Sequence, residues 1–142
     1  MKKLITLLVM VVLIGCAACA QKLDASKVPA AVKAAFTKQY PGTAVKWEME
    51  DGKYEASFKQ NGSSMSVLYG ANGTMTESEV DIKTTELPAA VLAYVKEHYK
   101  GKSIKEGAKI TKADGTVNFE AEVDGKDVIF DASGKFIKEV KD

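Results

Sequence analysis

The sequence contains no arginine, one histidine (His98), one tryptophan (Trp47) and two cysteines (Cys16 and Cys19) in 142 residues. Its 20 cationic residues are all lysines, and 19 acidic residues nearly balance them. This composition argues against nucleic-acid binding, where a basic face and arginine forks supply most contacts. The only two cysteines, Cys16 and Cys19, lie near the N-terminus, and no cysteine follows Cys19. With a single histidine and no usable cysteine pair, a zinc finger, a histidine-rich zinc site and a CxxC redox centre are excluded.

The first 20 residues have the pattern of a secretory signal peptide. A basic start precedes an apolar run over residues 4–14, which is shorter than the roughly 20 residues that a bilayer span needs. Two processing sites fit this segment. LIGC at 13–16 resembles a lipobox in which Cys16 would be lipidated, whereas ACA at 18–20 would be cut after Ala20. We therefore expect an exported, periplasmic protein that is either soluble or lipid-anchored.

The remaining chain contains two copies of one sequence unit. Three blocks recur in the same order: VPAAV (28–32) as LPAAV (87–91), KYEA (53–56) as NFEA (118–121), and VLYGANG (67–73) as VIFDASG (128–134). The offset between the copies changes only between these blocks, where loops tolerate differences in length. The matches predict repeats over residues 21–83 and 84–142, which we expect to form one structural domain.

Each repeat is expected to start with a helix and to continue as four strands. Apolar residues recur at spacings of three and four over residues 28–40 and 87–99, which is the stripe of an amphipathic helix. Ser26 and Thr85 stand where N-caps are expected, with a proline inside each first turn. Alternating apolar and polar residues follow, separated by pairs of a small polar residue and glycine that suit tight hairpins.

These patterns predict an α+β fold of two tandem repeats, each one helix followed by a four-stranded antiparallel meander. The helix stripe and the apolar face of the sheet would bury one another. Eight strands side by side and two packed sheets are both consistent with the pattern.

The order and duplication of these motifs resemble the PepSY-like, beta-lactamase-inhibitor-like proteins exported by Bacteroidetes. The resemblance covers residues 26–140 and rests on the Pro-Ala-Ala-Val helix, the Glu-Ala strand and the Ala-Asn/Ser-Gly turn. It implies an exported domain without enzymatic activity. It also implies a fold similar to that of the bacterial protein inhibitors of beta-lactamase. Those inhibitors carry disulfides and an aromatic-rich binding face, and this sequence has neither, so no inhibitory residues are assigned.

Few side chains have the pattern of a chemical site. His98 is the only side chain that ordinarily titrates near neutral pH, but no nucleophile or second ligand is linked to it, so it is interpreted as a boundary residue of the helix stripe. Acidic pairs spaced by two residues occur in three predicted strands: Glu48 and Glu50, Glu77 and Glu79, and Glu120 and Glu122. Each pair would share one strand face, either as a solvated surface or as an acid–base or calcium site. The loop at Asp131 is interpreted as a hairpin turn.

Two aliphatic residues are candidates for an interaction surface. Leu68 and Ile129 occupy equivalent positions in the two repeats, and their parity along the strand is opposite to that of their apolar neighbours. If those neighbours are buried, Leu68 and Ile129 emerge on the solvated face, where they would pack between the repeats or contact a partner. Trp47, Tyr54 and Phe58 share the parity of core residues and are predicted to be buried.

Taken together, the sequence favours a non-enzymatic exported binding module that contacts another envelope protein. No catalytic motif, cofactor site or metal site is assigned. A periplasmic protein that binds a small ligand or calcium through its acidic pairs is the alternative, and literal inhibition of a beta-lactamase or protease is a further one. A hydrolase would have only His98 as an obvious general base.

Overall fold

The structure is a computed structural model that describes residues 21–141; the predicted processing sites at Cys16 and Ala20 lie outside this range. The helices are α1 (Ala30–Gln39) and α2 (Ala89–His98), each preceded by a short 3-10 helix, η1 (Ala25–Lys27) and η2 (Thr84–Glu86). The strands are β1 (Gln21–Leu23), β2 (Val45–Glu50), β3 (Lys53–Gln60), β4 (Ser63–Tyr69), β5 (Met75–Ile82), β6 (Ile104–Lys112), β7 (Val117–Val123), β8 (Lys126–Asp131) and β9 (Phe136–Lys141). Within 21–141 no helix has the length and apolar character needed to cross a membrane.

All the strands belong to one antiparallel sheet whose spatial order, β1 to β9, is the order in the chain. The predicted α+β class and the helix-plus-four-strand repeat are confirmed. The sheet has nine strands rather than eight because Gln21–Leu23 pairs with Met49–Trp47 of β2. β5 and β6 join the two repeats through six paired residues, so the arrangement is a single continuous sheet.

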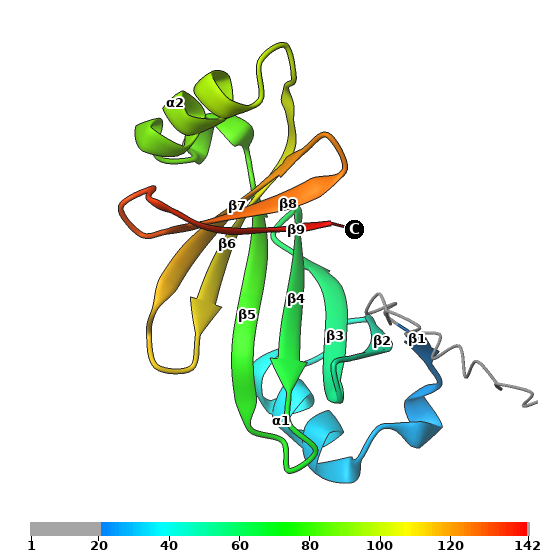
Figure 1. Cartoon of the computed structure of the whole chain (residues 1–142). Helices are drawn as coiled ribbons and strands as arrows, with labels where there is room; N and C mark the ends of the chain where they lie inside the picture. Colours follow the sequence, from blue (N-terminus) through cyan, green and yellow to red (C-terminus); the bar gives the residue numbers. More distant parts are fainter. Residues whose placement is uncertain (1–20, 142) are drawn as a thin grey trace, which may run out of the picture.

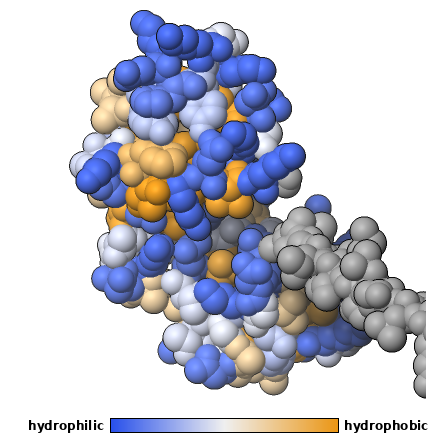
Figure 2. Space-filling view, viewed as in Figure 1, coloured by the Kyte–Doolittle hydropathy of each residue, from blue (hydrophilic) through white to orange (hydrophobic). Residues whose placement is uncertain are grey.

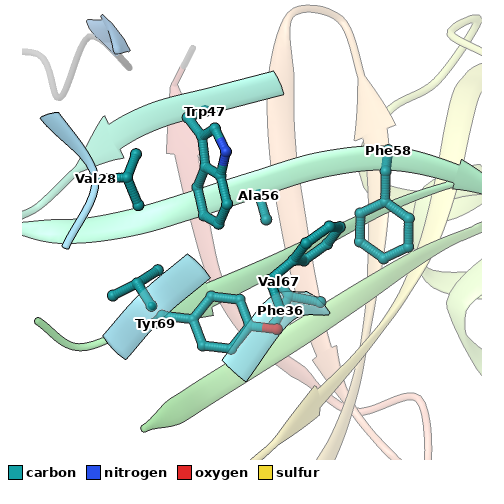
Figure 3. Packing of buried hydrophobic residues seen from close by; sticks show 8 residues of the cluster. Val28, Phe36, Trp47, Ala56, Phe58, Val67 and Tyr69 are labelled. Carbon is teal, nitrogen blue, oxygen red and sulfur yellow. The ribbon is translucent and has the colours of Figure 1, made fainter. Parts of the chain in front are cut away.

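Both helices lie on the same face of the sheet, one over each half (Figure 1). In the first half, Phe36 of α1 packs edge-on against Trp47 and Phe58, with ring centroids 5.5 and 5.2 Å apart. Figure 3 shows these side chains together with the fully buried Val67. The prediction that Trp47 and Phe58 are core residues is confirmed, and Tyr54 packs half-buried against the same cluster. Burying a side chain of this size contributes about 1.5–3 kcal/mol.

The second half repeats this packing with different side chains. Val91 and Val95 of α2 lie on a cluster that includes Val123, Val128 and Phe130. The two cores are separate clusters, and each is formed by one helix and the strands beneath it. The duplication seen in the sequence is therefore a duplication of a core as well.

The helices begin differently from the expectation. Pro29 and Pro88 are themselves the N-cap residues, and neither makes a side-chain cap. Ser26 lies inside η1, where its backbone N–H donates to Asp24, and Thr85 lies inside η2. The N-cap assignment of Ser26 and Thr85 was wrong because a separate 3-10 turn precedes each proline.

The predicted hairpin turns are present, and two of them pack closely against the helices. Gly73 has φ +82°, and a Cβ built there would lie 2.6 Å from the carbonyl oxygen of Ala31 in α1. Gly134, its equivalent, has φ +83°, and its Cβ would lie 2.7 Å from that of Ala90 in α2. Each turn thus needs glycine both for its backbone conformation and for its close approach to a helix. The Pro-Ala-Ala segments provide the small residues against which these turns pack.

Candidate functional site

The face of the sheet that carries no helix is hollowed. A cavity of about 570 Å³ lies between β3–β5 of the first repeat and β7–β9 of the second. In Figure 1, β9 passes in front of β4, and the residues that line the cavity come from both strands. The two halves of one twisted sheet therefore face each other across this hollow.

The floor of the hollow contains three aliphatic side chains, each flanked by polar neighbours on the adjacent strands. Leu68 lies between Glu55 and Glu77. Ile110 lies between Glu79 and Asn118, and Ile129 lies between Glu120 and Lys138. Apolar contact area surrounded by charge is the arrangement of many protein interfaces.

Leu68 and Ile129 lie on the face that their parity indicates, and both line the hollow. Their exposure differs from the expectation. Leu68 is half-buried, and Ile129 is buried with 7% of its surface exposed. The expectation that both emerge into solvent was wrong for Ile129, because β9 and the opposite half of the sheet cover the position.

Carboxylates predominate around the hollow, and Glu79 is the most perturbed of them. Burial, together with the nearby carboxylates of Asp81, Glu55, Glu77 and Asp127, raises the pKa of Glu79 to about 7. Loss of hydration disfavours the ionised form, and like charges add to the effect. Glu79 is therefore divided between its protonated and ionised forms near neutral pH.

Other charges complete the wall. Burial and the neighbouring Glu55 raise the pKa of Glu50 at one side of the hollow. Lys112, Lys138 and Lys141 line it as well, so both signs of charge are present. All three predicted acidic pairs lie on this helix-free face, since their strand partners do. Among residues 21–141, no three His, Cys, Asp or Glu side chains are grouped so as to hold a metal ion.

His98 and Asp131 have structural roles in the folded chain. His98 lies at the end of α2, where its Nδ1 is 3.0 Å from the carbonyl oxygen of Tyr94 and its ring stacks on that tyrosine. Asp131 Oδ1 accepts hydrogen bonds from the Ser133 N–H and hydroxyl and from the Lys135 N–H, which closes the hairpin turn. These bonds lower the pKa of Asp131. Neither residue lines the hollow.

Several lining residues have no strong signal in the sequence. Ile110 has the parity of the helix-free face, but it stands between Lys109 and Thr111, so no continuous apolar alternation marks it. Val140 and Lys138 lie in a last strand whose alternation is weak. Glu79 belongs to one of the three acidic pairs noted in the sequence, but nothing in the sequence distinguishes it from the other five acids. Only the pairing of β5 with β6 and the folding of β9 across the sheet bring these residues together.

The fold and the hollow define a tandem-repeat α+β protein with an open, helix-free sheet face. A family model described as "Putative beta-lactamase-inhibitor-like, PepSY-like" matches residues 17–77 and 52–138. The chain belongs to this family. No curated protein matches the sequence.

Solved structures from Bacteroides share the fold. A DUF2874 family protein from Bacteroides uniformis is 23% identical, with a TM-score of 0.69 over 79% of this chain and 88% of that one. A BLIP-like protein from Bacteroides fragilis is 27% identical, with a TM-score of 0.63 over 79% and 85%. A protein from Bacteroides eggerthii described as "putative periplasmic" is 18% identical, with a TM-score of 0.67 over 80% and 88%.

Proposed function

We propose that the protein is a non-catalytic binding module of the cell envelope that holds a segment of another exported protein in the hollow of its sheet. The observation that carries this proposal is the aliphatic floor of Leu68, Ile110 and Ile129 at the bottom of a charged, open cavity. Within this floor the half-buried Leu68 supplies most of the accessible apolar area, since Ile110 and Ile129 are buried. The surrounding charges would orient a partner and exclude others.

The chemistry of the hollow supports binding rather than catalysis. Its ionisable groups are carboxylates and lysines, and His98 lies elsewhere. Covalent catalysis requires a nucleophile oriented by a base. Ser66 lines the hollow opposite Glu79, but no hydrogen bond joins this hydroxyl to that carboxylate. The apparent signal peptide and the periplasmic description of the Bacteroides eggerthii structure support an envelope location.

A small organic ligand is the second candidate, and the size of the hollow favours it. A volume of about 570 Å³ falls within the range of about 300–1,000 Å³ that small-molecule sites occupy. A ligand that binds only the folded protein would raise its melting temperature in a ligand panel. Calcium belongs in the same panel as the cation that the acidic pairs suggest.

Capture from an envelope extract of the native host tests the binding role. The bait is the chain from Gln21 onward, and mass spectrometry identifies what it retains. Leu68→Lys places a charge on the floor of the hollow, and Ala34→Lys places the same charge on the exposed surface of α1 as a matched control. We expect one reproducible partner that Leu68→Lys loses and Ala34→Lys keeps, with both variants folded by circular dichroism. Equal capture by both variants would contradict the hollow as the contact surface.

A further inference from the structure

The outer edge of β9 pairs with no strand among residues 21–141. β9 is the last strand of the sheet, and it pairs only with β8 among the described residues. A strand at the edge of a sheet presents a row of backbone N–H and C=O groups that another strand can pair with. The opposite edge of the sheet ends in β1, which is only three residues long.

The internal repeat shows which kind of strand pairs with this edge, because the equivalent strand of the first repeat is paired. β5 is the equivalent of β9, since each strand follows the same irregularity in register, at Leu68/Tyr69 and at Ile129/Phe130. Met75 lies opposite Tyr69 as Phe136 lies opposite Phe130. β5 is bound along its outer edge by β6, in antiparallel pairing. The corresponding position beside β9 is empty of any strand from residues 21–141.

β9 is also more exposed to solvent than β5, as expected if its neighbouring strand is missing. Every residue of β9 is exposed, whereas β5 is half-buried at seven of its eight positions. Phe136, Ile137 and Val140 are 37%, 49% and 43% exposed, and Leu92 is the other large apolar side chain exposed among the described residues. Figure 2 shows apolar surface across the middle of this view, where β9 passes in Figure 1.

We propose that β9 binds an extended segment of the partner as a tenth, antiparallel strand of the sheet. The inference rests on the proposed binding role and specifies how the partner is held. Lys138 and Val140 of β9 line the hollow, so a strand added beside them continues its wall. Backbone pairing would supply affinity, and the side chains that alternate toward the hollow would supply specificity.

A second copy of β9 does not suit this edge. In an antiparallel pair of two β9 strands related by a two-fold axis, residues directly opposite each other point to the same face of the sheet. The residue at the centre of the pairing therefore lies opposite its own copy. The two registers that pair the most residues of β9 place Lys138 opposite Lys138 or Glu139 opposite Glu139. Like charges directly opposite each other destabilise a strand pair. Because the longest self-pairings of β9 are disfavoured, we assign the edge to a segment of another protein.

The β5–β6 pair indicates the chemistry of that segment. On the hollow face, Glu77 of β5 lies opposite Lys112, and Glu79 lies opposite Ile110. The equivalents of Glu77 and Glu79 in β9 are Lys138 and Val140. β9 has a lysine where β5 has Glu77, so a complementary partner strand needs an acidic residue where β6 has Lys112. It would thus place an acidic residue opposite Lys138 and an apolar residue opposite Val140.

Two synthetic peptides and two protein variants test this pairing. The acidic peptide copies residues 104–112 with Lys109→Glu and Lys112→Glu, and the second peptide has the natural sequence. Lys138→Glu reverses the charge on β9, and Lys96→Glu makes the same change on the exposed surface of α2. Hydrogen exchange of the residue 136–141 amides, measured by NMR with millimolar peptide, reports the site of binding.

We expect the acidic peptide to slow exchange at β9 and to bind about three- to tenfold more tightly than the natural peptide. Lys138→Glu should abolish that preference, because Lys141 still faces the residue at position 109 of each peptide, and Lys96→Glu should leave it unchanged. Unprotected β9 amides with both peptides would overturn the inference, as would equal effects of the two variants. If the peptides do not protect β9 but capture of a partner still depends on Leu68, only the added strand is refuted and the proposed function stands. If a peptide pairs with β9 but no partner is captured, the hollow is refuted as the contact surface.

Discussion

Replacing Glu79 by glutamine is predicted to make the protein more stable at every pH above about 4.5, with the full effect reached above pH 7. The pKa of Glu79 is about 7 in the folded chain, against an ordinary value of 4.5. The folded state therefore holds the proton more tightly than the unfolded state does. Stability from this group is fully present below about pH 4.5 and is lost as the pH rises through 7.

The size of the effect follows from the shift. A difference of about 2.5 in pKa corresponds to about 3.5 kcal/mol, at about 1.4 kcal/mol per unit. Glutamine keeps the shape of the side chain and carries no charge, so it avoids this destabilisation at any pH. The free energy of unfolding of Glu79→Gln should equal that of the natural protein near pH 4 and exceed it by about 3 kcal/mol at pH 8.

Urea unfolding followed by circular dichroism at pH 4, 6 and 8 measures this difference. Glu97→Gln, on the exposed surface of α2, is the matched control and should change stability by less than about 0.5 kcal/mol at each pH. A stability difference for Glu79→Gln that does not vary with pH would refute the reasoning. So would a lower stability of this variant at pH 8.

Three further outcomes follow from the fold. Gly73→Ala should destabilise the protein by more than Gly62→Ala, because both positions have a positive φ but only the Cβ at position 73 meets a backbone atom, the Ala31 carbonyl oxygen. Backbone strain alone, as at Gly62, costs about 1 kcal/mol, and chemical denaturation of the two variants measures the difference. Val67→Ala, in the fully buried first core, should cost about 2 kcal/mol in the same assay, since it removes buried methyl groups and leaves a cavity. Asp131→Asn should destabilise the protein above about pH 4, and the difference from the natural protein should disappear as the pH falls below the lowered pKa of the Asp131 carboxyl. Equal losses of stability at pH 2 and pH 7 would contradict the role of this carboxylate in the turn.

The repeat, the helices and the order of the strands within each repeat could be predicted from the sequence because local patterns determine them, whereas the joining of both repeats into one sheet could not. Apolar spacing over residues 28–40 and 87–99 marks the helices, and the Asn-Gly and Asp-Gly pairs mark the hairpins. The strand at residues 21–23 was not predicted, since three residues are too few to show alternation. Ser26 and Thr85 were assigned as N-caps because the extra 3-10 turns leave no distinctive pattern.

The candidate site could be predicted only in part. Parity along the strand correctly assigns Leu68 and Ile129 to the face opposite the helices. It does not indicate that this face is hollow, because twist accumulates over many strands and depends on residues distant in sequence. The burial of Ile129 and the pKa of Glu79 both depend on the two halves facing each other. Ile110 was missed for the same reason.

Site-specific photo-crosslinking tests the central claim, that the hollow holds a segment of another protein, most directly. A photoreactive phenylalanine analogue at position 68 lies on the floor of the hollow, and the same analogue at position 34 lies on the outer surface of α1. In cells of the native host, we predict one crosslinked partner protein from position 68 and none from position 34. Folded protein with no crosslink at position 68, or with the same products from both positions, would contradict the account.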